Sequence, residues 1–403
     1  MSGDSRAFDL STLCAQAGVG PRAGDPLRPA VVQSTTFCRS GIDDGAVHQY
    51  SRVSNPTVSA LERELGALES ALPAACFSTG LAAETALFLA VLSVGDHVVC
   101  GRSVYGGTTR LLTRLLSKLG ITSTFVDATR TAEITAAIRP NTKLVFLESP
   151  SNPTLELTDI RAAARATGAA GILLAVDNTF LTPVFQQPLD LGADVSVYST
   201  TKLIDGHSAA LGGALVTRSA QLLEQIKFIR KSTGAIQTPQ NASLTLQGLK
   251  TLALRAARQA ESAWTVARWL ESREEVERVL YPGLAKDADQ RRIAAAQHLG
   301  GHGNVIGFEL RGGFEAAKAF VGGLKLCKLV EHVGSVETLV THSASMTHAD
   351  VPREQRIAAG ITDGFLRLSV GIESCEAIVA DLRGAIEGVA ASGASSALEV
   401  AVV

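Results

Sequence analysis

The chain alternates between short apolar runs and amphipathic segments from about residue 62 onward. Strand-like runs rich in β-branched residues are HVVC (97–100), STFVD (123–127), KLVFLES (143–149), ILLAVDN (172–178) and VSVYS (195–199). Helical spacing predicts helices near 57–70, 80–92, 109–119, 132–138 and 159–166. Strands that alternate with helices predict an α/β fold with a mostly parallel sheet covered on both faces. In such sheets binding sites gather at the carboxyl ends of the strands.

The pattern changes on either side of this region. A long helical region spans about 219–272, and beyond it we expect strands at 276–283, 304–310, 324–330 and 365–372 and helices near 313–322, 353–358 and 374–388. Residues 1–60 are rich in turn residues and weakly periodic, which is typical of an arm that packs on another surface. We therefore expect an arm (1–60), a large domain (61–255) and a smaller α/β domain (256–403), with a loose tail from 391.

Composition and charge exclude several classes of protein. Hydrophobic residues make up 46% and charged residues 19% of 403 residues, as in a well-buried globular protein. The net charge is -2 and no Lys/Arg run occurs, so we expect no nucleic-acid partner. The longest strongly apolar stretch, 85–94, is too short to span a bilayer, so we expect no membrane association. Six scattered cysteines with no CxxC pair are typical of reduced thiols in a cytoplasmic protein.

Two ionisable residues stand at the ends of neighbouring apolar strands. Lys202 follows the run VSVYSTT, and Asp177 ends ILLAVD, twenty-five residues earlier. A lone lysine in a loop is usually a solvated side chain, but a carboxylate at the end of a buried strand is costly unless a cation faces it. The pair therefore favours a shared site over two unrelated surface residues.

A phosphate-binding turn completes a pattern that suits pyridoxal 5'-phosphate (PLP). This cofactor needs an amine for its aldehyde and a carboxylate for its pyridine nitrogen, roles that fit Lys202 and Asp177. The segment STGL opens a helix with Gly80 and Leu81, where backbone N–H groups favour an anion. On its own STG is more often a plain helix cap. Together with the hydroxyls of Ser199 and Thr201, it predicts a phosphate site.

Ten ordered motifs resemble those of one enzyme family. They are QSTTF (33–37), YSRVSNPT (50–57), FSTGLAA (77–83), YGGT (105–108), ESPSNPT (148–154), VDNTF (176–180), STTKLIDGHS (199–208), QGLKTL (247–252), THSASMTHA (341–349) and LRLSVGIE (366–373). Over about 33–382 the chain resembles the transsulfuration family of Cys/Met metabolism, the cystathionine γ-synthase, cystathionine γ-lyase and methionine γ-lyase group. The resemblance implies fold type I, the aspartate aminotransferase-like fold, with the PLP-binding large domain at 61–255.

The resemblance also implies a role for each matching position. Lys202 would be the Schiff-base lysine and proton shuttle, and Tyr105 would stack on the cofactor and transfer protons. The remaining cofactor contacts would be Gly80, Leu81, Asn152, Asp177, Thr179, Ser199 and Thr201, with Tyr50 and Arg52 reaching the phosphate of a neighbouring subunit. Arg367 would bind the substrate α-carboxylate, and Ser335 and Glu337 would lie at its distal end. The family's usual assembly is a homotetramer, a dimer of dimers with intersubunit active sites.

The resemblance leaves the reaction open. We expect γ-elimination or γ-replacement of the cystathionine γ-synthase or γ-lyase type on small amino-acid substrates. The alternatives are a methionine γ-lyase, an O-acyl-homoserine sulfhydrylase or a PLP-binding regulatory paralogue without activity. Gly107 stands where methionine γ-lyases usually carry a cysteine, and Glu337 matches a glutamate of the cystathionine enzymes, although a solvated loop acid is an even alternative. His207, His342 and His348 lack metal-ligand spacing, so no metal is expected.

Overall fold

A computed structural model describes residues 8–20, 23–42, 44–349, 351 and 353–400. The chain divides into two compact units, the first formed by Met1–Ser149 and Thr158–Leu254 and the second by Pro150–Leu157 and Arg255–Val403. The short segment Pro150–Leu157 thus belongs to the second unit, although the chain on both sides of it builds the first. Among the described residues, no helix is both long and apolar enough to cross a membrane.

The first unit is built on a seven-stranded sheet within the described residues. Its order is β1-β7-β6-β5-β4-β2-β3, and β7 runs antiparallel to both of its neighbours while the other pairs are parallel. The strands are β1 (Ala75–Phe77), β2 (His97–Gly101), β3 (Thr122–Val126), β4 (Thr142–Glu148), β5 (Leu173–Asp177), β6 (Val195–Tyr198) and β7 (Gly213–Thr217). The sheet confirms the predicted α/β architecture.

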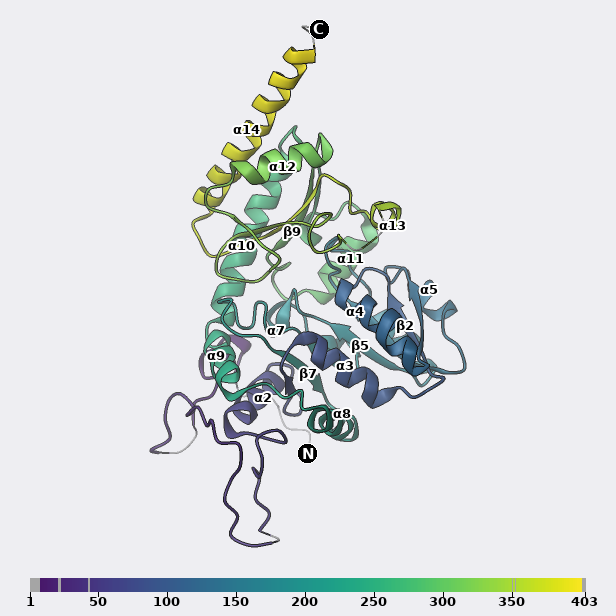
Figure 1. Ribbon diagram of the computed structural model, residues 1–403, viewed down its shortest axis with the longest axis vertical. Coiled ribbons are helices and arrows are strands. Elements are labelled where there is room, and N and C mark those ends of the chain that lie inside the picture. Colours follow the sequence, from purple (N-terminus) through teal and green to yellow (C-terminus); the bar gives the residue numbers. More distant parts are fainter. Residues whose placement is uncertain (1–7, 21–22, 43, 350, 352, 401–403) are drawn as a thin grey trace. The chain divides into compact units, whose positions relative to one another are not determined.

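Helices cover both faces of this sheet, which explains why its strands are apolar along their whole length. Helices α3 (Gly80–Val91) and α8 (Ala220–Thr233) pack against each other on one face (Figure 1). The other face carries α2 (Pro56–Leu68), α9 (Pro239–Leu249), α5 (Thr131–Ala136) and α6 (Ile160–Ala169). Smaller elements are α1 (Leu10–Ala15), α4 (Gly106–Arg110) and α7 (Thr182–Phe185). Successive residues of one strand, such as Phe146 and Leu147, thus pack into different cores on opposite faces of the sheet.

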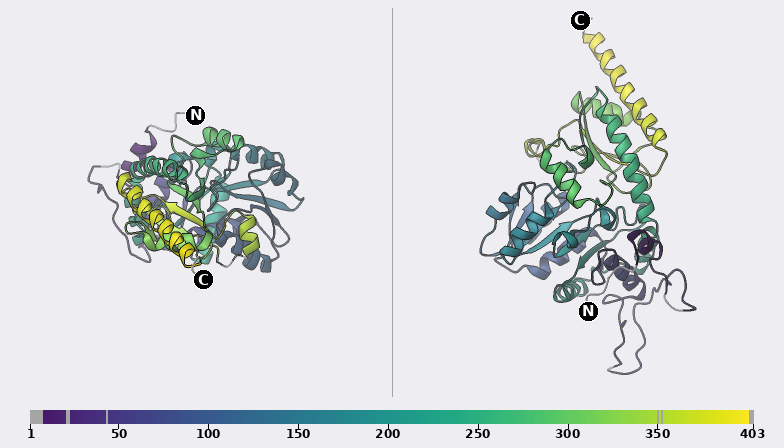
Figure 2. Two further views of the ribbon diagram at one scale, coloured as in Figure 1. Left: turned by 90° about the horizontal axis from the view of Figure 1, so that it is seen from above. Right: turned by 180° about the vertical axis from the view of Figure 1, so that it is seen from behind.

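The second unit has its own five-stranded sheet within the described residues. Its order is β10-β11-β12-β9-β8, antiparallel except for the β10–β11 pair. The strands are β8 (Val276–Leu280), β9 (Val305–Leu310), β10 (Lys328–Leu329), β11 (Leu339–His342) and β12 (Phe365–Ser369), and the helices are α10 (Leu252–Glu271), α11 (Ala288–Gln297), α12 (Gly313–Gly323), α13 (Arg353–Ala358) and α14 (Cys375–Val400). Helices α12 and α14 lie side by side, as both views in Figure 2 show.

Several boundaries differ from the predicted ones for identifiable reasons. The region 219–272 is three helices, because Gly234 adopts a left-handed conformation (φ 74°) and Pro239 starts a new helix behind the capping residue Thr238. The expected helix 109–119 is α4 followed by a π-helical turn, Leu111–Leu115, and a 3-10 turn, Leu116–Leu119. The prediction of a loose tail is wrong for the described part, because α14 continues to Val400 through an alanine-rich segment.

Candidate functional site

Several of the predicted cofactor residues of the first unit lie on segments that leave one edge of its sheet. Strands β2, β4, β5 and β6 are parallel, so their carboxyl ends lie together. Asp177 ends β5 and stands opposite Glu148 in β4 and Val197 in β6. The loop with Tyr105 follows β2, and the turn with Lys202 follows β6. The first unit therefore places Asp177, Tyr105 and Lys202 on segments that leave the same edge.

Asp177 is a buried carboxyl group whose ionisation depends on its surroundings. Only 7% of its surface is exposed, and burial raises its pKa to about 6, while hydrogen bonds from Thr179 oppose this rise. The backbone N–H of Thr179 donates to Asp177 Oδ1 at 2.8 Å. A cation facing the carboxyl would favour its charged form, which is what a protonated pyridine nitrogen provides.

The Lys202 turn is tied to the Asp177 turn by a hydrogen bond. The backbone N–H of Ser199 donates to Thr179 Oγ1 at 2.9 Å, and the N–H of Lys202 donates to the Ser199 carbonyl oxygen at 3.2 Å. Thr201 Oγ1 donates to the Gly212 carbonyl oxygen at 3.1 Å and accepts from the Gly212 N–H at 2.9 Å. Thr179, predicted as a cofactor contact, thus also joins the turns after β5 and β6.

The amino end of α3 lies directly against Ser199. The Thr79 side chain caps the helix by accepting from the Ala82 N–H at 3.0 Å. The N–H groups of Gly80 and Leu81 are the first of the helix and have no acceptor within it. A Cβ atom at position 80 would stand 3.0 Å from Ser199 Cβ, which is tighter than an ordinary van der Waals contact, so glycine favours this approach. Open N–H groups and a hydroxyl side by side fit the phosphate of PLP.

Tyr105 stands at the start of a tight turn beside the amino end of α3. Its side chain is 43% exposed, and its ring lies so close to Gly107 that a Cβ atom there would overlap it. The same Cβ atom would stand 2.9 Å from Leu81 Cδ1, so the Tyr105 ring and Leu81 flank one glycine. The structure thus brings an exposed aromatic face to the predicted phosphate-binding turn.

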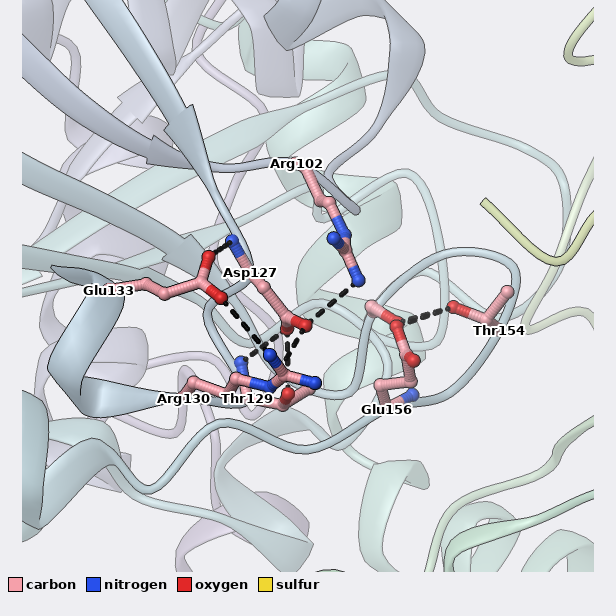
Figure 3. Close-up of polar contacts among 8 residues, drawn as sticks. Arg102, Asp127, Thr129, Arg130, Glu133, Thr154 and Glu156 are labelled. Atoms are coloured by element: carbon pink, nitrogen blue, oxygen red, sulfur yellow. Dashed lines mark hydrogen bonds and ion pairs between the residues drawn. The ribbon is translucent and has the colours of Figure 1, made fainter. Parts of the chain in front are cut away.

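A network of charged side chains holds the loop before Tyr105. Figure 3 shows Arg102, Thr129 and Arg130 pointing toward Asp127, which follows β3. Arg102 Nη2 donates to Asp127 Oδ2 at 2.9 Å, and Thr129 Oγ1 donates to Oδ1 at 2.6 Å. Arg102 is therefore anchored three residues before Tyr105.

In the second unit, Thr154 Oγ1 donates to Glu156 Oε2 at 3.3 Å, a contact that is also drawn in Figure 3.

Two more buried carboxyl groups support this edge, and sequence reasoning missed both. Glu148 Oε2 accepts from the Tyr105 N–H at 2.7 Å, and Glu84 Oε2 accepts from Thr108 Oγ1 at 2.7 Å. Burial, with a smaller contribution from Asp177, raises the pKa of Glu84 to about 8. A signal existed for Glu84, because it is the one acidic residue in the apolar helix segment GLAAETALFLAV.

The second unit contains the predicted substrate-carboxylate site. Arg367, in the middle of β12, is buried and donates from Nη1 to Asn152 Oδ1 at 2.8 Å. Its Nη2 donates to Thr341 Oγ1 at 3.2 Å and to the His332 carbonyl oxygen at 3.4 Å. Asn152 and Arg367, predicted to contact cofactor and substrate, are therefore direct neighbours within one unit.

The loop with Ser335 and Glu337 is fixed by hydrogen bonds to the buried Gln259 and the half-buried Glu373. Ser335 Oγ donates to Glu337 Oε2, and the Glu337 side chain is exposed. Gln259 Nε2 donates to the Ser335 carbonyl oxygen at 2.7 Å, while Glu373 accepts from Thr338 N–H at 2.6 Å and from Thr338 Oγ1 at 2.7 Å. The loop thus presents a carboxylate from a fixed backbone.

Tyr50 and Arg52 lie just before α2, and Arg52 contacts the end of α8. Arg52 lies over the Tyr50 ring, 5.2 Å from its centroid, and Arg52 Nη1 donates to the Lys231 carbonyl oxygen at 2.6 Å. The Tyr50 carbonyl oxygen accepts from the N–H groups of Val53 and Ser54 at 2.9 and 3.1 Å, and within the described part of the chain none of these contacts joins either residue to the Lys202 turn. Their predicted role at a neighbouring subunit stays a prediction.

The described residues fit PLP better than a metal ion. The donor set at the sheet edge contains an amine, a buried carboxyl group, hydroxyls and open backbone N–H groups. The described residues contain no group of three or more His, Cys, Asp or Glu side chains that could hold a metal ion.

Comparisons with known proteins identify the family. A family model described as "Cys/Met metabolism PLP-dependent enzyme" matches residues 11–387. The chain is 42% identical to a cystathionine γ-lyase of Bacillus subtilis, covering 94% of this chain and 99% of that protein. It is 39% identical to an L-methionine γ-lyase of Fusobacterium nucleatum subsp. polymorphum, covering 95% and 99%.

A solved structure supports the same conclusion for the fold. Cystathionine γ-synthase from Xanthomonas oryzae pv. oryzae matches with a TM-score of 0.92 and 40% identity, over 96% of this chain and 100% of that one. The predicted fold type I and the predicted cofactor are thereby confirmed. The protein belongs to the PLP-dependent enzymes of Cys/Met metabolism.

Proposed function

We propose that this enzyme acts at Cγ of cystathionine or of an activated homoserine ester, by γ-elimination or γ-replacement. The observation that carries the proposal is the arrangement at the first unit's sheet edge, where the Lys202 turn, the Asp177 turn and the Tyr105 turn leave adjacent strands. Chemistry at Cγ needs a base that serves two carbon atoms in turn and an acid for the leaving group. Lys202 and Tyr105 supply these two functions.

Each residue of the proposed site has a defined task. PLP, when bound, supplies an electron sink for charge that develops on the substrate carbon atoms. Lys202 Nζ, as the neutral amine, takes a proton from Cα, delivers it to the bound cofactor and, neutral again, takes a proton from Cβ, while the Tyr105 hydroxyl gives a proton to the leaving sulfur or oxygen. Asp177 keeps a proton on the pyridine nitrogen, and Gly80, Leu81, Ser199 and Thr201 bind the phosphate. Arg367 holds the α-carboxylate with its two-pronged guanidinium group.

The choice of substrate falls to the distal residues rather than to the cofactor residues. Glu337 is exposed and fixed by Ser335, so it can pair with the distal ammonium group of cystathionine, which methionine lacks. Gly107 leaves no room for a side chain beneath the Tyr105 ring, which disfavours the methionine γ-lyase arrangement with a cysteine there. The relatives named above include a cystathionine γ-lyase and an L-methionine γ-lyase at similar sequence identity, so sequence identity does not distinguish between these two activities.

A substrate panel tests this proposal. The purified enzyme is incubated separately with cystathionine, methionine and O-acyl-homoserines with and without cysteine, and keto acid, thiol and cystathionine are measured. We expect turnover of cystathionine, or cystathionine formation from an ester and cysteine, at a higher kcat/KM than turnover of methionine. A higher kcat/KM for methionine would replace the proposal by the methionine γ-lyase alternative.

We further propose that the enzyme is a cytoplasmic homotetramer whose arms complete neighbouring sites. The loop with Tyr50 and Arg52 exposes apolar side chains such as Ile42 and Val47, which favours a second surface that covers them. All six cysteines are free thiols, as suits a reducing compartment. Mixed oligomers of inactive Arg52→Ala and inactive Lys202→Ala subunits should regain part of the activity. Verified mixed oligomers without activity would contradict shared sites.

A further inference from the structure

The turn at residues 105–108 is tethered at both of its ends. The Thr108 N–H donates to the Tyr105 carbonyl oxygen at 2.9 Å and closes the turn. At one end, the Tyr105 N–H donates to Glu148 at 2.7 Å, and at the other end the Thr108 hydroxyl donates to Glu84 at 2.7 Å. The two residues between the tethers are glycines, so they have no side chains that could hold the turn.

Glu84 is the unusual member of this arrangement. It lies one helical turn after Gly80 in α3, is only 3% exposed, and has buried alanine, leucine and phenylalanine side chains of its own helix as neighbours along the chain. A buried carboxyl group without a partner is costly, so its placement needs a compensating contact. Within the described residues, the one hydrogen bond of its side chain is the bond from Thr108, which is itself only 1% exposed.

The electrostatics favour a neutral Glu84. Burial and the nearby Asp177 raise its pKa to about 8, so near pH 7 Glu84 holds a proton. A neutral carboxyl group and a hydroxyl can each donate or accept, so their hydrogen bond persists without a second charge beside Asp177. Glu84 thus stabilises the turn without competing with Asp177 for the cation that Asp177 is proposed to hold.

The position of the Tyr105 ring depends on this turn. The ring lies over Gly107 without room for even a Cβ atom, and Leu81 borders the same glycine. A shift of Thr108 would therefore also move Gly107, the residue that the ring contacts. Displacements of about 1 Å at reacting groups can lower rates by about a hundred-fold.

We propose that Glu84 is a positioning residue for Tyr105, acting through the Thr108 hydroxyl to fix the turn that carries the ring. The expected effect on turnover rests on the proposed function, because it assumes that Tyr105 transfers protons. The expected effect on the position of the Tyr105 ring does not depend on that function. Glu84 touches neither substrate nor cofactor in this proposal.

The test uses the full-length, PLP-loaded enzyme with 3-fluorotyrosine in place of tyrosine. The chain has four tyrosines, so four ¹⁹F resonances report on Tyr50, Tyr105, Tyr198 and Tyr281, and Tyr105→Phe assigns the relevant one. Two variants break the pair, Glu84→Leu and Thr108→Val, and two keep a hydrogen-bonding group, Glu84→Gln and Thr108→Ser. Steady-state kinetics are measured on wild type, Tyr105→Phe, these four variants and the double variant Glu84→Leu/Thr108→Val.

Thr142→Val is the matched control. Thr142 is a buried threonine at the start of β4, and its hydroxyl bonds to His97 Nδ1 and to the Arg139 N–H, both at 2.8 Å, at the opposite end of the strand from Glu148. The variant Thr142→Val removes a buried hydroxyl group from the sheet of the first unit and leaves the contacts of the turn at residues 105–108 unchanged. Any general effect of such a loss on the fold appears in this variant too.

We expect the Tyr105 resonance to shift or broaden in Glu84→Leu and Thr108→Val, while the other three resonances and all four in Thr142→Val stay unchanged. In the two broken-pair variants kcat should fall about ten- to a hundred-fold, with KM changed by less than about two-fold because substrate binding is not affected. Glu84→Gln and Thr108→Ser should recover most of the rate. The double variant Glu84→Leu/Thr108→Val should lose no more than either single one.

An unchanged Tyr105 resonance in both Thr108→Val and Glu84→Leu would overturn the inference. If Glu84→Leu fails to fold, an unchanged resonance in Thr108→Val alone has the same force. Failure of the proposed function gives a different result: Tyr105→Phe would then keep normal turnover, while the ¹⁹F spectra would still show whether Glu84 positions the ring.

Discussion

Arg367 Nη1 donates a hydrogen bond of 2.8 Å to Asn152 Oδ1, although the two residues lie 215 positions apart in the chain. Arginine is only a donor, so the amide atom that faces it is the oxygen, and Asn152 Nδ2 remains as the donor of the amide. An N–H donor is what a contact to the phenolic oxygen of PLP requires. The two residues therefore couple the proposed substrate-carboxylate site to the proposed cofactor contact.

Replacing Arg367 with lysine should weaken substrate binding, because a point charge cannot donate the parallel pair of hydrogen bonds that a carboxylate accepts. Losing such a charged contact costs about 1.5 to 3 kcal/mol, or roughly a ten- to hundred-fold rise in KM. The measurement is KM for the preferred amino acid, beside an amine analogue without the α-carboxylate. An unchanged KM for the amino acid would assign its carboxylate to another residue.

Lys202→Ala should purify without the visible absorption of the bound cofactor, because no other residue is proposed to hold its aldehyde. Borohydride reduction of the wild type followed by peptide mapping should find the cofactor attached to Lys202. Lys250→Ala, in which a half-buried lysine that donates to the Ala15 carbonyl oxygen is lost, should keep the absorption. Attachment to a different lysine would refute the assignment of Lys202.

Asp177→Asn should still bind PLP through Lys202 and the phosphate contacts, but it should lose nearly all turnover. A neutral amide does not favour a proton on the pyridine nitrogen, so the electron sink weakens. Asp194→Asn is the control, because Asp194 is also a carboxyl group with a raised pKa and accepts from the Leu174 N–H at 2.8 Å at the start of β5. Normal turnover of Asp177→Asn, measured with saturating PLP, would exclude the proposed role.

Glu84→Gln should change how stability depends on pH. Burial raises the pKa of Glu84 from 4.5 to about 8 in the folded protein, so between these values the unfolded chain releases a proton that the folded chain keeps. Glu84 therefore contributes full stability below about pH 4.5 and loses it as the pH rises to 8. Each pH unit in this window costs on the order of 1.4 kcal/mol.

Glutamine does not titrate, so the Tm of the wild type should fall relative to the Tm of Glu84→Gln as the pH rises. The comparison is Tm of both proteins at several pH values from 5 to 9 in one ionic strength. The difference should grow up to about pH 8 and then level off. A difference that stays constant over this range would show that Glu84 is charged in the folded protein at low pH already.

Glu337→Ala should narrow the preference for cystathionine over methionine by roughly ten- to a hundred-fold in kcat/KM, because one charged contact to the distal ammonium group is lost. Glu331→Ala, which removes another exposed acid of the same unit, should leave the ratio unchanged. If the ratio of kcat/KM for cystathionine to kcat/KM for methionine were equal in wild type and Glu337→Ala, Glu337 would be a solvated loop acid without a role in substrate choice.

The sequence allowed prediction of the residues that sit on regular elements or in contiguous motifs. The apolar strand ending in Asp177 and the turn beginning at Ser199 were recognisable because both faces of the strands are buried. The short strands β1 and β7 were missed, since small residues such as Ala75 and Gly213 carry little periodic signal.

The supporting contacts were beyond reach because they join residues that are distant in sequence. Nothing in the local pattern pairs Glu84 with Thr108, or Gln259 with the carbonyl group of Ser335. Such pairs depend on how helices dock on a sheet, which residue spacing along one element does not determine.

The most direct test of the account is the identity of the keto acid that the purified enzyme releases from cystathionine. With water, cleavage at Cγ gives 2-oxobutanoate, ammonia and cysteine, whereas cleavage at Cβ gives pyruvate, ammonia and homocysteine. We predict 2-oxobutanoate, with no release by Lys202→Ala. Pyruvate as the main product would contradict the central claim that this site works at Cγ.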